Sequence, residues 1–266
     1  MAMKTGHGQA ANCAARTDVG RIREHNEDSY CVNQDIGLYV VADGMGGHAS
    51  GEVASELAVT AIEQQVKQGN SLVEAIEVAH LAILKGVETG AGKPGMGTTV
   101  VAVQLQDNAY TLAWVGDSRA YLWDGSLTRI SKDHSLVQML LDSRQITEDE
   151  ARVHPRKNII YQNLGAIDID NLQVSVKQGV LYKDQKIMLC SDGLSDELDD
   201  QQMNEIIVQT DGDDKIVERL VDAAIDNGGS DNVSVVVISA PDDALERPMS
   251  DPVQVEVSKD TLVPDE

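Results

Sequence analysis

Three aspartates, each beside a run of apolar residues, are the side chains of this chain best suited to chemistry. Asp43 and Asp192 each follow four or five mostly apolar residues and precede glycine, and Asp231 stands just before a third apolar run. A single Asp-Gly pair predicts only a tight turn. A carboxylate beside buried strands, however, costs several kcal/mol unless it is paired or coordinated. Because basic residues are scarce nearby, the three aspartates together predict a divalent metal site.

Carboxylate oxygens suit the hard cations Mg²⁺ or Mn²⁺ better than metals that prefer thiolate or imidazole. Two such ions about 4 Å apart would acidify a bridging water and hold the attacking oxygen for displacement at phosphorus. A phosphate substrate also needs a positive contact. Segment 17–28 offers Arg23, and it offers Asp28 as a residue that could hold metal-bound water. On spacing alone, the preferred interpretation of this segment is a polar loop with local salt bridges.

The apolar patterns predict an α+β fold, because groups of strands follow one another instead of alternating with crossover helices. We expect a four-layer αββα sandwich, with two central, mostly antiparallel β-sheets flanked by helix pairs. Strands are expected at 11–17, 28–34, 37–43, 97–106, 109–116, 119–124, 171–177, 185–191 and 232–239. Helices are expected at 50–67, 71–87, 134–141, 147–153, 200–209 and 214–227.

Capping boxes mark the starts of two of these helices, at Ser71 with Glu74 and at Thr147 with Glu150. In a sandwich of this kind, the ends of several strands converge at one edge. The acidic residues expected to meet there are Asp43, Asp117, Asp192 and Asp231.

The composition predicts one domain over residues 12–240, preceded by a flexible N-terminus at 1–11. The segment 241–266 has four prolines and eight acidic residues against two basic ones, which predicts a disordered acidic tail. The net charge of −23 argues against binding nucleic acid or an anionic membrane surface and favours a monomer. No apolar run approaches the ~20 residues that span a bilayer, so we expect a cytoplasmic protein. Its three cysteines are interpreted as reduced core thiols.

At six places the sequence resembles the metal-dependent protein phosphatases (PPM, or type 2C), in their compact bacterial form. The matching segments occur in the family's order between residues 12 and 240. They are Gly20-x-x-Arg23-x-x-Asn26-Glu27-Asp28, Ala42-Asp43-Gly44-Met45-Gly46-Gly47-His48-x-x-Gly51-Glu52, Gly97-Thr98-Thr99, Gly116-Asp117-Ser118-Arg119, Leu189-x-Ser191-Asp192-Gly193 and Asp231-Asn232-Val233-Ser234. Chance does not supply six such matches in order, so the resemblance is specific.

The resemblance implies a set of metal ligands. Asp43 would bridge two catalytic ions, Mn²⁺ or Mg²⁺, and the carbonyl of Gly44 would help to bind the second. Asp192 and Asp231 would bind the first ion. Bacterial members of the family often hold a third ion, and Asp117 together with Asp192 resembles that site.

The resemblance also implies that Arg23 binds the substrate phosphate and that Asp28 acts through water. Eukaryotic relatives place a histidine directly after Asp-Gly, where it is thought to protonate the leaving group. This chain has Met45 there and His48 later in the same loop. The general acid is therefore either His48 or metal-bound water, and a purely structural His48 is at least as well supported.

Several neighbouring matches imply supporting roles. We expect Gly97-Thr98-Thr99 to begin a close-packed core strand and Ser118-Arg119 to orient Asp117. Ser230 and Asn232 flank Asp231, and we expect them to hold its carboxylate by hydrogen bonds.

Residues 134–165 resemble the mobile flap beside the active site of bacterial relatives. Four basic residues gather in it, and they are Arg144, Arg152, Arg156 and Lys157. A solvated helix face is the preferred interpretation of this cluster. The alternative is that it steers a phosphorylated or acidic substrate.

The leading hypothesis is a serine/threonine phosphoprotein phosphatase, in which metal-activated water attacks phosphorus directly. As the resemblance implies, its substrates would be phosphorylated by a cognate serine/threonine kinase in bacterial signalling. One alternative is a catalytically silent relative that binds phosphoproteins as a regulatory module, although that reading expects metal-binding aspartates to be lost. Another is a two-metal phosphodiesterase, for which the acidic composition disfavours nucleic-acid substrates.

Overall fold

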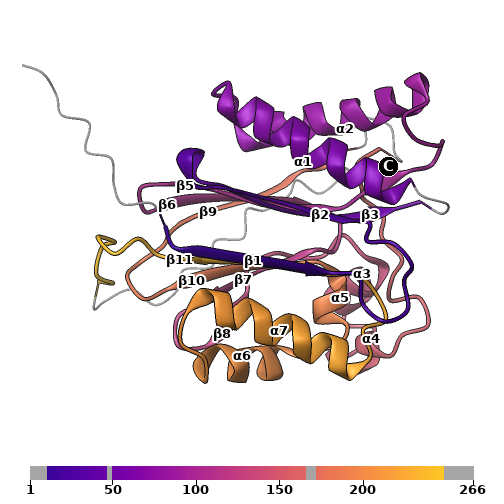
Figure 1. Cartoon of the computed structure of the whole chain (residues 1–266). Helices are drawn as coiled ribbons and strands as arrows, with labels where there is room; N and C mark the ends of the chain where they lie inside the picture. The colour runs from indigo at the N-terminus through magenta and orange to yellow at the C-terminus, as the bar shows by residue number, and fades with distance from the viewer. Residues whose placement is uncertain (1–10, 47–49, 166–171, 249–266) are drawn as a thin grey trace, which may run out of the picture.

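Two antiparallel sheets packed face to face form the centre of the molecule, and a pair of helices covers each outer side (Figure 1). The computed structural model describes residues 11–46, 50–165 and 172–248. This arrangement confirms the predicted four-layer αββα sandwich.

Each sheet combines strands from distant parts of the sequence. The strands of the first sheet are β1 (Cys13–Asp18), β7 (Arg119–Trp123), β8 (Leu127–Arg129), β10 (Lys186–Cys190) and β11 (Val233–Ser239). Those of the second are β2 (Asp28–Asn33), β3 (Leu38–Met45), β4 (Gly97–Thr98), β5 (Val100–Gln106), β6 (Ala109–Val115) and β9 (Ser175–Val180). Their spatial orders are β1-β11-β10-β7-β8 and β2-β3-β5-β6-β9, with β4 beside β3. The first and last strands of the described chain thus pair with each other, as β1–β11.

The helices fall into three groups. The elements that cover the second sheet are α1 (Gly51–Lys67) and α2 (Leu72–Thr89), and those that cover the first are α6 (Asp200–Val208) and α7 (Asp213–Asn227). The short helices are α3 (Leu136–Asp142), α4 (Glu148–Arg152), α5 (Asp192–Ser195) and the 3₁₀ turn η1 (Gln34–Ile36). Figure 1 shows α3, α4 and α5 together at one end of the sandwich. No helix in the described part of the chain is both long and apolar enough to cross a membrane.

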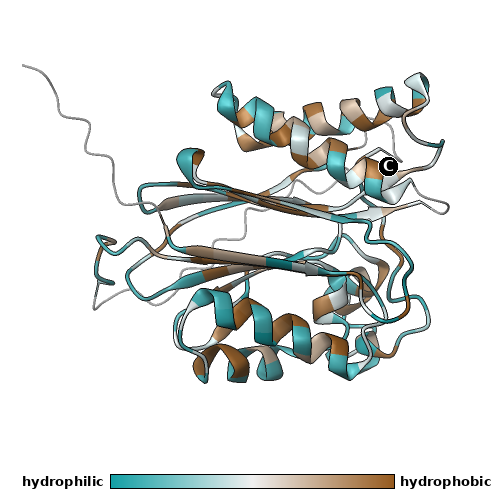
Figure 2. Cartoon of the chain, viewed as in Figure 1, coloured by the Kyte–Doolittle hydropathy of each residue, from teal (hydrophilic) through white to brown (hydrophobic). Residues whose placement is uncertain are grey.

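Adjacent residues on the central strands face opposite layers, which fixes the register of each sheet. Val41 and Val236 lie in the core between the sheets, while Val40 packs with α1 and α2 and Val235 packs with α6 and α7. Strands buried on both faces read as continuous apolar runs, and Figure 2 shows the apolar residues concentrated in these layers. Long apolar runs therefore lead directly to the polar end of the sandwich.

Most predicted elements form close to their expected bounds, and both predicted capping boxes are present. Three short elements of the described chain were not predicted, the 3₁₀ turn η1, the edge strand β8 and the single-turn helix α5. The strand expected at 171–177 lies instead at Ser175–Val180, and residue 171 is outside the described residues.

The chain beyond residue 240, expected to be a disordered tail, stays in contact with the sandwich as far as it is described. Ala244 is 7% exposed and belongs to the core between the sheets. Arg247 forms an ion pair with Asp124, and the backbone N–H of Lys183 donates to the carbonyl of Leu245. Residues 1–10 and 249–266 lie outside the described residues, so the flexible N-terminus and the rest of the tail remain predictions.

Candidate active site

Asp43 ends the apolar part of β3, and two threonines hold its backbone. The N–H of Thr99 and the hydroxyl of Thr98 both donate to the carbonyl of Asp43, at 2.9 and 2.8 Å. The N–H of Asp43 donates to Oγ1 of Thr99 at 3.2 Å. Gly97-Thr98-Thr99, predicted only to begin a core strand, thus also fixes the position from which Asp43 extends.

Gly44 follows in a space that admits no side chain. A Cβ at this position would overlap the carbonyl of Gly51 and lie 2.5 Å from the carbonyl of Glu27. The N–H of Gly44 donates to that same Glu27 carbonyl at 3.1 Å. Glycine is therefore required where β3 passes the start of α1, and metal binding through its carbonyl stays a prediction.

Asp28 lies directly opposite Asp43 in the antiparallel pair β2–β3. It is 9% exposed, and its Oδ2 accepts a hydrogen bond of 2.8 Å from Ser191, the residue before Asp192. Its Oδ1 is buried and has no hydrogen-bond partner among the described residues. Burial raises the pKa of Asp28 to about 7, assisted by the charges of Asp192 and Asp231 and opposed by hydrogen bonds from Ser191 and Ser234.

Asp192 starts α5 immediately after β10. The next residue, Gly193, has no room for a side chain because a Cβ there would overlap the carbonyl of Asn232. Burial raises the pKa of Asp192 to about 6, and the charges of Asp196 and Asp231 add to this effect. The α5 turn is therefore packed closely against the segment that carries Asp231.

Asn232 holds the loop that precedes β2. Its side-chain amide donates to the carbonyls of Val19 and His25, at 2.9 and 3.0 Å, and its Oδ1 accepts from the N–H of Glu27 at 2.8 Å. Its own N–H donates to Oδ1 of Asp231 at 2.8 Å. The predicted contact with the Asp231 carboxylate therefore comes from the backbone of Asn232, while its side chain shapes the Arg23 loop.

Arg23 lies at the rim of the site with its side chain 51% exposed. One guanidinium nitrogen donates to Oδ2 of Asp231 at 2.6 Å. The residue predicted to bind phosphate is therefore adjacent to a predicted metal ligand, and half of its side chain faces solvent.

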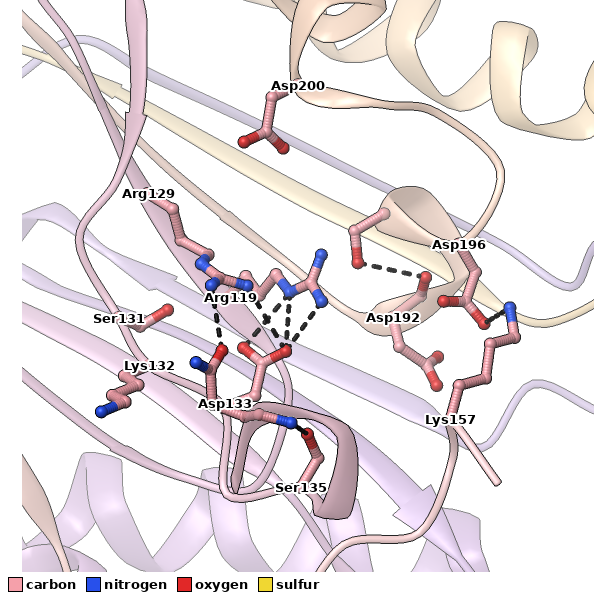
Figure 3. Close-up of polar contacts among 12 residues, drawn as sticks. Arg119, Arg129, Ser131, Lys132, Asp133, Ser135, Lys157, Asp192, Asp196 and Asp200 are labelled. Carbon is pink, nitrogen blue, oxygen red and sulfur yellow. Dashed lines mark hydrogen bonds and ion pairs between the residues drawn. The ribbon is translucent and has the colours of Figure 1, made fainter. Parts of the chain in front are cut away.

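Asp117 follows β6 and Gly116. The hydroxyls of Ser118 and Thr99 are 2.7 Å apart, which connects the Asp117 turn to the threonines behind Asp43. Arg119 makes a bidentate contact with Asp133, in which Nε donates to Oδ1 at 3.2 Å and a terminal nitrogen donates to Oδ2 at 2.7 Å (Figure 3). Asp133, 4% exposed, was not singled out from the sequence, because nothing local marks it as the partner of a residue fourteen positions earlier.

The flap, residues 134–165, is anchored at its base by His134. The N–H of His134 donates to the carbonyl of Gly116 at 2.9 Å, and its Nδ1 accepts from the N–H of Gly116 at 3.1 Å. The ring stacks on Trp114, and the N–H of Tyr161 donates to the His134 carbonyl. Both ends of the flap thus meet beside the Asp117 turn.

A cleft of about 690 Å³ separates the flap from α5 and α6. Asp117 and Asp192 line it, together with two of the four basic flap residues, Arg152 and Lys157. Lys157 pairs with Asp196 at 2.7 Å across this cleft (Figure 3). The predicted basic cluster thus faces the candidate site in part.

The predicted acidic residues lie close enough for their charges to affect one another's pKa values. Burial, and then the charges of the neighbouring aspartates, raise the pKa of both Asp43 and Asp117 well above the ordinary range. Mutual repulsion of this kind is relieved by cations. The oxygen-only donor set and the unpaired Oδ1 of Asp28 fit Mg²⁺ or Mn²⁺.

The aspartates do not form a preassembled cage. Among the described residues, no three histidine, cysteine or acidic side chains are grouped as a complete metal-binding cluster. The metal assignment therefore depends on the burial of the aspartates and on their oxygen-donor chemistry.

Of the predictions for His48 and Ser230, the first is untested and the second is wrong. His48 lies outside the described residues, so its role remains a prediction. Ser230 was expected to hold Asp231. Instead, both its hydroxyl and its backbone N–H donate to the carboxylate of Glu197.

Comparisons with known proteins place this site in a family context. The sequence profile of protein phosphatase 2C matches residues 21–212. The serine/threonine protein phosphatase PstP of Mycobacterium tuberculosis is 39% identical over 238 residues, which cover 86% of this chain but 45% of PstP. The serine/threonine phosphatase stp of Listeria innocua is 35% identical over 240 residues, which cover 84% of this chain and 93% of that protein.

A solved structure shares the fold. It is the catalytic domain of PstP in complex with two manganese ions, which superimposes with a TM-score of 0.79 at 36% identity and covers 88% of this chain and 99% of that one.

Proposed function

This chain belongs to the protein phosphatase 2C family, and we propose that it hydrolyses phosphoserine and phosphothreonine in proteins, assisted by divalent metal ions. The observation that carries the proposal is the convergence of Asp28, Asp43, Asp117 and Asp192 at one end of the sandwich, where burial and mutual charge raise all four pKa values. Such a site is unfavourable unless cations occupy it.

Four residues of the chain would bind the two catalytic ions. Asp43 would bridge two ions with help from the Gly44 carbonyl, and Asp192 and Asp231 would hold the first ion. When bound, the ions supply positive charge to the phosphate and an acidified water. The structure of M. tuberculosis PstP with two manganese ions supports a two-ion site. Adding Mn²⁺ and Mg²⁺ separately to the metal-free protein would distinguish between the two ions.

Arg23 would bind and orient the phosphate. Its guanidinium is half exposed and touches Asp231 through one nitrogen, so other donors remain available to a phosphate at the rim. Asp28 would hold a water through its unpaired Oδ1. We retain His48 as one candidate for the general acid.

A third ion would be held by Asp117 together with Asp192. Both line the cleft beside the flap, and the charge of Asp192 raises the pKa of Asp117, which supports a shared site for these two residues.

The natural substrates we propose are phosphoproteins made by a cognate serine/threonine kinase. The names of the relatives support phosphoprotein substrates. We further propose a monomer that binds neither nucleic acid nor an anionic membrane surface, on the basis of the net charge of −23. Its expected location is the cytoplasm. Residues 12–240 would carry the activity, with the flap at 134–165.

The decisive experiment is hydrolysis of p-nitrophenyl phosphate and a phosphothreonine peptide by the purified protein in EDTA, followed by addition of Mn²⁺ or Mg²⁺. We expect activity to require metal and Asp192→Ala to abolish it. Asp226→Ala is the matched control, because Asp226 is an exposed partner of Arg21. A fully active Asp192→Ala protein would refute the metal assignment, and inactivity of the metal-loaded wild type on both substrates would refute the phosphatase.

A further inference from the structure

Glu197 lies on the chain between the two aspartates proposed to bind the first metal ion. It follows Asp192 by five residues, just after α5, and it contacts the loop that leads from α7 to Asp231. Its Oε1 accepts hydrogen bonds from the hydroxyl of Ser230 at 2.5 Å and from the N–H of Ser230 at 3.0 Å. Ser230 immediately precedes Asp231, so one carboxylate oxygen of Glu197 fixes the residue next to a proposed ligand.

Two further contacts hold the same loop against Glu197. The side chain of Asn227 donates to the Glu197 carbonyl at 2.9 Å. The Glu197 carboxylate packs so closely on Gly228 that a Cβ there would lie 2.8 Å from Oε2. A carboxylate that accepts a hydroxyl and an N–H makes charge-assisted hydrogen bonds, which are about twice as strong as neutral ones.

The opposite side of this loop is held independently. The N–H of Arg21 donates to the carbonyl of Gly229 at 2.8 Å, and Gly20 has no room for a side chain beside the Asp231 carbonyl. Strand pairing beyond Asn232 fixes the following residues. Glu197 therefore ties the start of the Asp231 segment to the chain just after α5, in addition to the close packing of Gly193 on Asn232.

We propose that Glu197 is a positioning residue that sets the placement of Asp231 relative to Asp192 and thereby the affinity of the first metal ion. It makes no ion pair with a lysine or arginine in the described part of the chain, and its carboxylate contacts Ser230 and Gly228. The inference relies on the proposed function, because it takes Asp192 and Asp231 as ligands of one ion. Groups that orient metal ligands contribute about 10–100-fold in affinity.

The test is calorimetric titration of Mn²⁺ into metal-free protein at fixed pH, which reads binding directly and needs no turnover. We expect Glu197→Ala to weaken one Mn²⁺ site by about 10–100-fold. Glu197→Gln keeps an acceptor oxygen for Ser230 and removes the charge, so we expect affinity within about threefold of wild type, since neutral hydrogen bonds retain part of the strength. Glu205→Ala, on the exposed face of α6, removes one negative charge without touching the loop and serves as control.

Ser230→Ala provides a second route to the same conclusion if Glu197→Ala fails to fold. It removes one of the two hydrogen bonds, and we expect weaker Mn²⁺ binding than in wild type. In the double variant with Glu197→Ala, the Ser230→Ala change should add almost nothing, because the two residues act through one contact.

The outcomes separate this inference from the proposed function. If wild-type protein binds no Mn²⁺, both the metal centre and the inference are wrong. If wild type binds and Asp192→Ala does not, but Glu197→Ala and Ser230→Ala bind like wild type, only the positioning role is overturned. A Glu197→Gln protein as weak as Glu197→Ala would also overturn it, because charge and not geometry would then set the affinity.

Discussion

Asp28 and Asp43 occupy opposite positions on neighbouring antiparallel strands, although like charges at such positions repel. Ser191 donates to Asp28, and threonines hold the backbone of Asp43. Neither contact brings positive charge to the pair. The structure therefore retains an unfavourable arrangement where the apolar strand β3 ends beside the start of β2, which is the expected cost of a site that binds cations.

Metal binding should stabilise the fold substantially. Because Mn²⁺ neutralises carboxylates only in the folded state, Mn²⁺ at about 100 times its dissociation constant should add about 2.7 kcal/mol to the free energy of unfolding. The measurement is thermal melting in EDTA and in graded Mn²⁺. Asp43→Asn should melt higher than wild type in EDTA and gain less from Mn²⁺, and equal gains in both proteins would contradict the prediction.

The metal-free protein should lose stability as the pH rises from 5 to 8. The folded-state pKa values of Asp28 and Asp192 are raised, to about 7 and about 6, so folding favours their protonated forms. This favourable contribution is complete below their unfolded values near 4 and is lost as the pH rises through 6 and 7, with a slope of up to about 1.4 kcal/mol per pH unit for each group. Urea unfolding in EDTA at several pH values measures it.

The matched variant for this pH series is Asp28→Asn, which cannot ionise. Its stability should fall less steeply between pH 6 and 8 than that of wild type. Parallel pH profiles for the two proteins would show that Asp28 does not titrate in this range.

Arg23→Ala should raise KM for a phosphothreonine peptide while changing kcat little, because the variant loses a contact to the bound phosphate. Arg21→Ala is a close control, since Arg21 lies two residues away and its side chain pairs with the exposed Asp226. The measurement is the steady-state kcat and KM of both variants with the phosphothreonine peptide. An unchanged KM in Arg23→Ala would refute the proposed phosphate contact.

Asp133→Ala should lower the free energy of unfolding by about 3–5 kcal/mol, because it leaves the guanidinium of Arg119 without its bidentate partner in an enclosed place. Lys157→Ala breaks the Lys157–Asp196 pair, which is about one-third exposed, and should cost at most about 1 kcal/mol. Denaturant unfolding in the presence of Mn²⁺ compares the two. Similar losses would mean that burial does not distinguish these ion pairs.

The sequence predicted the sandwich because its apolar runs indicate groups of consecutive strands that do not alternate with crossover helices, and the structure shows that central strands such as β3 and β11 are buried on both faces. It also predicted the candidate ligands, since each aspartate stands at the end of such a run. The strand β8 was missed because its three residues, Leu127–Arg129, carry too little pattern. The single turn α5 was missed because Asp192–Ser195 resembles an ordinary Asp-Gly turn.

Contacts between distant residues could not be predicted in the same way. Asp133 and Glu197 look like ordinary surface acids, and their partners Arg119 and Ser230 lie 14 and 33 residues away. The contact of Ala244 with the core had no signal either, because a composition rich in proline and acid outweighed one small apolar residue. The hydrophobic pattern of a segment indicates which of its residues are buried. Which distant residue each side chain contacts becomes apparent only in the folded structure.

The hydrogen bond between Ser191 and Asp28 joins the two sheets, because Ser191 follows β10 of the first sheet and Asp28 begins β2 of the second. The candidate site therefore depends on the distance between the sheets, and that distance is set by apolar side chains of the core between them, such as Leu189 and Val236. Slight loosening of these layers on heating would separate the ligands while every strand remained paired. On warming, activity should therefore be lost at a lower temperature than the folded structure, because expansion of the core separates the ligands first.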